Sequence, residues 1–326
     1  MRRVFWTVSL VVVFVCWFAN PTWGQGYKPA RPVEVVVHTD PGGGSDIFAR
    51  AIVDMLEKEK LLPQRMNVLN KPGGSGATAM AYLAEKKGDD HTIGFFTNTW
   101  LVVPLTRKEA MVTIDQLTPV TRLVLEPMIV VVKADAPYKN MNDFIEAAKK
   151  NPGKLNQSGG SVTAQEALFR LVIQKATGTQ WNFISFPGGG ERISNLLGGN
   201  VQILMAQPQE ITEHIRSGSM RVIGVFGDKR LAGFPKVSTL KEQGFDIPPL
   251  DQARGVLAPP GVSKEVVLYW EDLLGRFVKT PSWKKYLTDN QLEDAFLKGQ
   301  DVAGFWKKQT DVLRNLLQEA GVKLAR

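Results

Sequence analysis

The sequence predicts an α/β fold with parallel sheets, in a chain long enough for two domains. Short β-branched runs alternate with amphipathic segments along most of the chain, which is typical of parallel sheets covered by helices. A glycine-rich turn precedes several of the amphipathic segments. The length of 326 residues corresponds to about two domains at roughly 100–200 residues each.

Composition narrows the class of protein further. The chain is 44% hydrophobic and 22% charged, which excludes a disordered, collagen-like or coiled-coil protein. A single cysteine excludes a disulfide framework and a cysteine-based zinc site. His38, His91 and His214 are scattered, so we expect neither a metal site nor a cofactor. The net charge of +8 means that an anionic ligand or a polyanion has to be considered.

The first 24 residues predict an export signal. Arg2 and Arg3 precede an uncharged apolar run over 4–18, and Thr22 and Gly24 stand at the usual small positions before a cleavage site. We therefore expect an exported protein, cleaved near Gly24. The alternative is a retained membrane anchor, but the run is shorter than the roughly 20 apolar residues that span a membrane.

The elements of the first part follow in order. We expect strands where β-branched residues cluster, turns where glycines cluster, and helices where apolar residues recur at helical spacing. The predicted strands are 33–37, 66–69 and 92–96; the predicted turns are 41–46 and 70–76; the predicted helices are 47–61 and 77–86.

The same unit recurs in the second part of the chain. A turn is expected at 158–162, and Thr163 with Glu166 predicts a capping box at the start of the helix that follows. A region rich in proline and glycine over 233–260 precedes the C-terminal helices. The predicted strands are 128–132, 181–186, 201–205 and 220–226, and the predicted helices are 142–150, 193–197, 208–217, 264–279, 281–286 and 301–320.

Four turns place glycines directly before a helix, and each is a potential anion site. Free backbone N–H groups and the positive end of the helix dipole coincide there, and glycine lets a ligand approach the backbone. Because ligands of open α/β sheets lie beyond the carboxyl ends of the strands, loops from two facing domains can converge on one cleft. Hydroxyl groups would add donors at Ser45, Ser75, Ser161 and Thr163, although Thr163 and Asp46 are equally explained as helix caps.

Nucleotides and nucleic acids are disfavoured as ligands. The sequence has no Walker A motif, and the G-x-G-x-x-A match at 74–79 is separated from its strand by Lys71-Pro72. Basic residues are interspersed with acidic ones, as at 58–60, and no basic run with interleaved aromatic residues occurs.

Catalytic motifs are also lacking in the sequence. There is no G-x-S-x-G elbow and no H-E-x-x-H, and we predict no catalytic residue. His38 ends the first strand and is a candidate ligand contact, whereas His91 and His214 are expected to be solvated. Glu166 and Asp251 are the candidate carboxylate bases, but neither has an identifiable partner in the sequence.

Two glycine-rich loops carry a resemblance to a known family. Strand–Pro41-Gly42-Gly43-Gly44-Ser45-Asp46 and Asn70-Lys71-Pro72-Gly73-Gly74-Ser75-Gly76-Ala77 are similar to the two leading motifs of the tripartite tricarboxylate transporter substrate-binding (Bug-type) receptors. The likeness continues, in order, through 152–155, 188–190, 196–202, 217–221 and 257–261. No single motif is specific, but the series covers nearly the whole mature chain.

The resemblance implies a type II, Venus-flytrap periplasmic binding protein with two crossing hinge segments. Domain 1 would comprise 27–123 and 227–326, and domain 2 would comprise 124–226. Such receptors act in the periplasm, hold a small carboxylate between the domains and deliver it to membrane transporter subunits. By position, the implied ligand-binding residues are Gly43, Gly44, Ser45, Asp46, Gly74, Ser75, Gly76, Thr97 and Asn98 on one side, and Ser161, Val162, Thr163, Gly189 and Gln207 on the other.

Two departures from the family fall on domain 2. Ala206-Gln207 stands where many relatives carry an aspartate, and the loop at 158–162 is shorter. Trp100 beside the third loop hints at an apolar ligand body, although a core tryptophan is the simpler interpretation. The sequence thus predicts a monomeric receptor for a mono- or dicarboxylate; the alternatives are a secreted enzyme acting on a small anion in the same cleft, or a ligand-sensing partner of a signalling protein.

Overall fold

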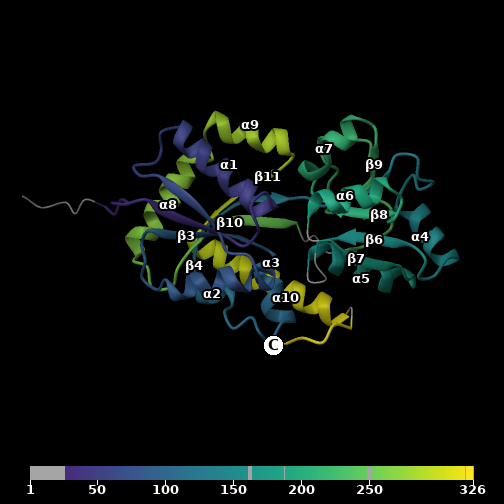
Figure 1. The fold of residues 1–326 in the computed structure, drawn as a ribbon, viewed down its shortest axis with the longest axis horizontal. Coiled ribbons are helices and arrows are strands. Elements are labelled where there is room, and N and C mark those ends of the chain that lie inside the picture. Colours follow the sequence, from purple (N-terminus) through teal and green to yellow (C-terminus); the bar gives the residue numbers. More distant parts are fainter. Residues whose placement is uncertain (1–25, 161–163, 187, 248–250, 320, 326) are drawn as a thin grey trace, which may run out of the picture.

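The computed structural model describes residues 26–160, 164–186, 188–247, 251–319 and 321–325. Two lobes, each built around one sheet, lie side by side (Figure 1). The chain passes to the second sheet between β4 and β5 and returns between β9 and β10. Among the described residues, no helix combines the length and apolar character needed to span a membrane.

The first lobe contains a six-stranded sheet in the order β11-β4-β10-β3-β1-β2. Alternate residues of β1 face opposite layers, so that Val35 and Val37 pack toward one set of helices and Val36 toward the other. Its strands are β1 (Val33–Val37), β2 (Met66–Asn70), β3 (Thr92–Thr97), β4 (Thr118–Glu126), β10 (Gln252–Ala258) and β11 (Glu293–Lys298).

Helices cover both faces of this sheet (Figure 1). One face carries α1 (Gly44–Lys58), α8 (Lys264–Phe277) and α9 (Pro281–Asn290). The other carries α2 (Ala77–Glu85), α3 (Thr99–Thr106) and α10 (Gly299–Glu319), with the short 3₁₀ turns η1 (Gly74–Gly76) and η2 (Ile114–Gln116) beside them.

The second lobe contains a five-stranded sheet in the order β7-β6-β8-β5-β9. One face packs on α4 (Met141–Lys150) and α5 (Gln165–Thr177), and the other on α6 (Gly189–Leu197) and α7 (Pro208–Arg216). Its strands are β5 (Ile129–Lys133), β6 (Asn156–Gly159), β7 (Asn182–Ser185), β8 (Ile203–Ala206) and β9 (Met220–Val225).

The sheets are mixed, so the prediction of parallel sheets is only partly right. β1, β2 and β3 pair in parallel, as do β6, β7 and β8. β10 is antiparallel to β3 and β4, β11 to β4, and β5 to β8 and β9. Parallel neighbours need a helical crossover. β5 and β10, the first strands after the two lobe crossings, follow β4 and β9 with no described helix between, so no crossover helix makes them parallel to a neighbour.

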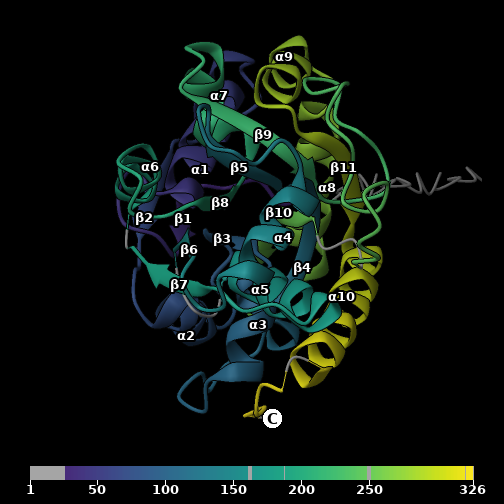
Figure 2. The ribbon, with the colours of Figure 1, turned by 90° about the vertical axis from the view of Figure 1, so that its right-hand side faces the viewer.

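One hydrophobic core continues from lobe to lobe. Phe169 of α5 stacks on Phe226, just after β9, with ring centroids 4.0 Å apart, and the same cluster includes Leu316 and Leu317 of α10. Figure 2, which views the molecule from the second lobe, shows α10 running alongside α5. The lobes are therefore packed against each other on this side of the molecule.

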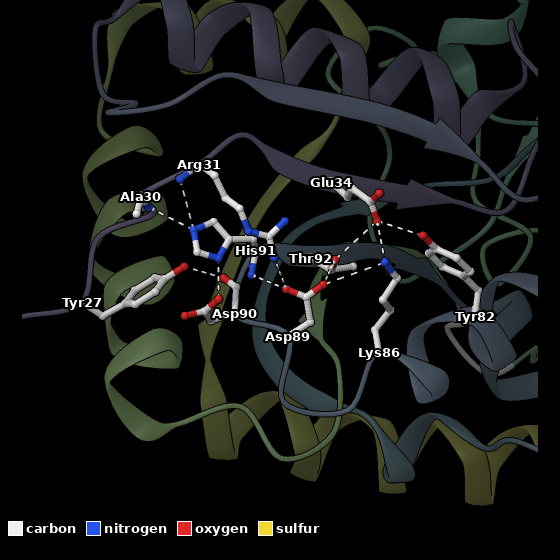
Figure 3. Close-up of polar contacts among 10 residues, drawn as sticks. All are labelled: Tyr27, Ala30, Arg31, Glu34, Tyr82, Lys86, Asp89, Asp90, His91 and Thr92. Atoms are coloured by element: carbon white, nitrogen blue, oxygen red, sulfur yellow. Dashed lines mark hydrogen bonds and ion pairs between the residues drawn. The ribbon is translucent and has the colours of Figure 1, made fainter.

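A polar cluster fixes the start of the described chain to β3 (Figure 3). The N–H of Ala30 donates to His91 Nε2 at 3.0 Å, the N–H of Arg31 to the same atom at 3.3 Å, and Arg31 pairs with Asp89 at 3.1 Å. His91 is 7% exposed, so the expectation that it is solvated is wrong. Its ring is needed as an acceptor for two backbone donors that approach from the N-terminal segment.

Candidate functional site: a cavity between the lobes

A cavity of about 910 Å³ is lined by groups from both lobes. The first lobe contributes the loops that follow β1, β2 and β3, together with Arg254 of β10. The second lobe contributes the loops that follow β6, β7 and β8. Because these loops lie at the carboxyl ends of parallel strands, the cavity is where an open α/β sheet binds its ligands. Of the ligand-binding residues that the family resemblance implies, those that line it are Gly43, Gly44, Ser45, Ser75, Thr97, Gly189 and Gln207.

The loop before α1 presents free backbone donors to the cavity. Gly43 precedes α1 in an extended conformation, and Gly42 has a positive φ of 79°, which glycine tolerates. Among the described residues, the N–H groups of Gly44 and Ser45 have no acceptor, as expected for the first turn of a helix. An anion placed here would meet two N–H groups and the positive end of a 15-residue helix.

Asp46 stabilises this loop from behind and does not line the cavity. Its carboxylate accepts hydrogen bonds from the Gly42 N–H at 2.9 Å, Arg50 Nε at 2.9 Å and Asn70 Nδ2 at 3.0 Å. Burial alone would raise the pKa of Asp46, but the hydrogen bonds from Arg50, Gly42 and Asn70 hold it below its usual value. The side chain thus shapes the glycine loop.

The second and third loops each contribute one residue of those predicted. Ser75 lines the cavity, whereas Gly74 and Gly76 do not; a Cβ on Gly76 would lie 3.3 Å from the Trp100 ring. Thr97 lines the cavity, and its buried hydroxyl has no hydrogen-bond partner. The amide of Asn98 instead donates to the Asp251 carbonyl at 2.9 Å and accepts from the Ala253 N–H at 3.1 Å, which links β3 to the start of β10.

On the second lobe, two of the predicted residues line the cavity and three lie outside the described part of the chain. Gly189 and Gln207 line the cavity, at the starts of α6 and α7. Ser161, Val162 and Thr163 lie outside the described residues. Helix α5 begins at Gln165 with Ala164 before it, and Glu166 Oε1 accepts from the Gly160 N–H at 2.7 Å. The capping box predicted from Thr163 and Glu166 involves a residue outside the described part of the chain and stays a prediction.

Sequence analysis missed Arg254, which lies at the back of the cavity. The guanidinium pairs with Glu126 of β4 at 2.6 Å and donates from Nη1 to Ser45 Oγ at 3.3 Å. Both side chains are almost fully buried, and burial raises the pKa of Glu126 while Arg254 opposes that rise. The sequence did contain a signal for this residue, because Arg254 is a charged residue inside the otherwise apolar run 253–258.

A second arginine, Arg192 of α6, was also missed. It donates from Nη2 to Glu210 Oε2 at 3.1 Å, and its Nη1 lies 3.8 Å from Glu166 Oε1. Glu166 therefore has a partner that the sequence did not reveal. Burial raises the pKa of Glu166, with Arg192 and the Gly160 N–H acting against it.

His38 lines the cavity as a neutral acceptor. Trp100 Nε1 donates to its Nδ1 at 3.0 Å, and Ser45 Oγ lies 3.5 Å from the same atom. Burial, with a smaller contribution from Arg254, lowers the pKa of His38 to about 4. Trp100 itself is fully buried, so it is a core residue that holds His38 in place.

Asp89, Asp90 and His91 are the described residues grouped closely enough for a metal ion (Figure 3). His91 Nδ1 bonds Asp90 Oδ1, and Nε2 accepts from two backbone N–H groups. Both ring nitrogens are thus committed to the protein, and the geometry is that of a structural anchor.

Comparison with known proteins identifies the family. Residues 48–322 match the sequence profile of the tripartite tricarboxylate transporter family receptors (TctC). The chain belongs to this family. Among curated relatives, a UPF0065 protein of Bordetella bronchiseptica is 30% identical over 303 residues, covering 90% of this chain and 87% of the relative. The UPF0065 protein in the gbd 5′ region of Cupriavidus necator is 29% identical over 309 residues, covering 94% and 93%.

Solved structures of other proteins share the fold. The periplasmic binding protein BugD superposes with a TM-score of 0.81 at 24% identity, covering 90% of this chain and 99% of BugD. A Rhodopseudomonas palustris protein determined with adipate gives 0.83 at 22% identity (90% and 98% covered), and MatC from the same organism, determined with malate, gives 0.78 at 22% (89% and 99%). The predicted two-domain periplasmic binding protein fold is confirmed, as is the predicted family.

Proposed function

We propose that this TctC receptor binds a small organic carboxylate in the cavity between its lobes and delivers it to a tripartite tricarboxylate-type membrane transporter. The observation that carries the proposal is the meeting, at one cavity, of free N–H groups at the start of α1 with Arg254 and with loops of the opposite lobe. Adipate and malate, the molecules named with two structural neighbours, are small carboxylates, which supports this class of ligand.

The contacts available are strong enough for such a ligand. A helix terminus contributes about 0.3–1 kcal/mol toward an anion, and each hydrogen bond to a charged group about 1.5–3 kcal/mol. Four or five contacts from Gly44, Ser45, Thr97 and the second-lobe loops therefore reach the roughly 8 kcal/mol of a micromolar complex after binding costs.

We propose that the receptor works by closure of two domains and not by chemistry. Domain 1 would be 27–123 with 227–326 and domain 2 would be 124–226, which places the hinges at the two lobe crossings. Bringing loops of both lobes onto one ligand would favour the closed form, which the transporter would then recognise. The two candidate catalytic bases are consistent with a receptor that does no chemistry. Glu166 is paired with Arg192, and Asp251 lines a different cavity.

The N-terminal segment, residues 1–24, accounts for export in this proposal. The charged start and apolar run of 1–24 would direct export and be removed near Gly24, so that a monomeric receptor acts in the periplasm. Mass spectrometry of the secreted protein tests the cleavage site, and an intact N-terminus on a membrane-bound product would favour the retained anchor.

Ligand-dependent stabilisation tests the binding function. Purified mature protein is screened by thermal unfolding against carboxylates, sugars and cations, because a ligand that binds only the native state raises the melting temperature. We expect at least one carboxylate to do so, and Gly44→Val to abolish the shift without unfolding the protein. Stabilisation by sugars or cations alone would reject the carboxylate receptor, and turnover of the bound compound would favour an enzyme.

A further inference from the structure

The two faces of the cavity differ in their balance of polar groups. The first-lobe face offers mainly hydrogen-bond donors: the N–H groups of Gly44 and Ser45, the guanidinium of Arg254 and the hydroxyl of Thr97, which has no partner among the described residues. Its one lining carboxylate, that of Asp40, belongs to an exposed residue. The second-lobe face carries three carboxylates, those of Glu166, Glu191 and Glu210, against one guanidinium, that of Arg192.

Arg192 does not neutralise this second face. Its Nη2 donates to Glu210 at 3.1 Å, and its Nη1 is 3.8 Å from Glu166, so that one positive charge is shared between two carboxylates. Glu191 lies in the first turn of α6 and adds a further carboxylate at the rim. Even with Glu166 protonated, two carboxylates face one cation, and the face keeps a negative charge.

Gln165 is a second, independent observation on the same face. The residue is 8% exposed and lines the cavity, yet in the described part of the chain neither its amide oxygen nor its amide nitrogen has a hydrogen-bond partner. Buried polar groups in folded proteins are nearly always hydrogen bonded, since an unpaired one costs free energy. An amide with an open acceptor beside two glutamates is suited to a ligand group that donates several N–H bonds.

We propose that the ligand is an amino carboxylate, held by its carboxylate on the first lobe and by a protonated amine on the second. The ammonium group would donate to Glu210, Glu166 and the amide oxygen of Gln165, and the carboxylate would accept from Gly44, Ser45 and Arg254. The inference rests on the proposed carboxylate-binding function and specifies its substrate class. A second carboxylate on the ligand would instead face Glu166 and Glu210 in a partly dehydrated site, where like charges repel.

Matched probes of equal chain length test the inference by calorimetric titration. The six-carbon set is 6-aminohexanoate, hexanoate and adipate, and the four-carbon set is 4-aminobutanoate, butanoate and succinate. We expect the amino acid of at least one set to bind ten-fold or more tightly than its diacid, with the plain monoacid between them. Equal or tighter binding of the diacids overturns the inference alone; absence of binding by every probe overturns it together with the carboxylate-binding function.

A substitution on α7 locates the effect. Glu210→Gln removes the charge from a partly exposed side chain. We expect it to weaken binding of the amino acid about ten-fold and to reduce the ratio of amino-acid affinity to diacid affinity. Glu213→Gln on the same helix is the control, because Glu213 is exposed, pairs with Arg216 and does not line the cavity. Gln165→Leu, of similar volume, is the second variant. It should weaken binding of the amino acid more than binding of the diacid. An unchanged ratio of amino-acid to diacid affinity in both variants would contradict the assignment.

Discussion

On the first lobe, the loop before α1 leaves the N–H groups of Gly44 and Ser45 free, and the acid of that turn, Asp46, points back to brace the loop. On the second lobe, the acid in the first turn of α5, Glu166, lies at the cavity and accepts from the Gly160 N–H. Both are glycine-containing turns that lead into a helix. At α1 the N–H groups stay open to an anion because the acidic residue of the turn points away from the cavity, whereas at α5 the acidic residue itself occupies a backbone donor.

The two arginines at the cavity, Arg254 and Arg192, also differ between the lobes. Arg254 is buried and pairs with a buried glutamate of the same sheet, whereas Arg192 is more exposed and pairs with residues of two neighbouring helices. Breaking the Arg254 pair leaves an uncompensated charge away from water. Breaking the Arg192 contacts leaves the partly exposed Glu210, which water can solvate, together with the buried Glu166.

The largest effect we expect is on stability, from Arg254→Met. Removal of the guanidinium strands the Glu126 carboxylate, so the free energy of unfolding should fall by about 3–5 kcal/mol. Arg192→Met should cost less, about 1–2 kcal/mol, because Glu210 stays partly solvated although the buried Glu166 also loses its cation. Urea denaturation of the two variants measures the difference, and equal losses would show that the contrast in burial is unimportant.

The second effect is on affinity, from a matched pair of glycine substitutions. Gly44→Val should weaken the carboxylate ligand about 100-fold, or about 2.7 kcal/mol, because its side chain would enter the space before the free N–H groups and beside Arg254. Gly189→Val, on the opposite face, should weaken it less. Gly304→Val on α10, where a side chain meets open space, is the control. Calorimetric titration measures the affinity of the three variants. A larger loss of affinity in Gly189→Val than in Gly44→Val would contradict binding of the carboxylate at the loop before α1.

The third effect is a pH dependence that originates on the first face. His38 has a lowered pKa of about 4, so the unfolded chain binds a proton more readily than the native protein between about pH 6.5 and 4. The free energy of unfolding should therefore fall by about 2–3 kcal/mol as the pH drops through this range. His38→Gln should flatten that part of the profile, and a profile identical to that of the unmodified protein would show that His38 does not cause it.

The smallest effect should come from Asp46→Asn. Weaker hydrogen bonds to Gly42 and Arg50 should lower the free energy of unfolding by about 1 kcal/mol. Because the pKa of Asp46 is lowered, its contribution is present at neutral pH and is lost as acid protonates it. Affinity should change far less than in Gly44→Val, and a loss as large would place Asp46 in contact with the ligand.

The sequence predicted local elements well where a periodic run and a turn coincide. Strand 33–37 and the helix from Ala77 follow directly from such patterns, and the structure has both. It did not predict β4, β10 or β11. The many prolines and glycines of 233–260 obscure β10, and β11, at the edge of its sheet, has little pattern of its own. Those strands also carry Glu126 and Arg254.

The sequence by itself determined the loops: glycines before helices fix where free N–H groups occur, because hydrogen bonding in the first helical turn is local. It also carried the series of motifs that identifies the family. Only the tertiary structure decided which loops share a cavity, that Asp46 and Asn98 support it from behind, and that Arg254 and Arg192 reach it. Residues 45 and 254 are neighbours only because β10 returns from the other lobe and inserts beside β3, and no local pattern encodes such a long-range pairing.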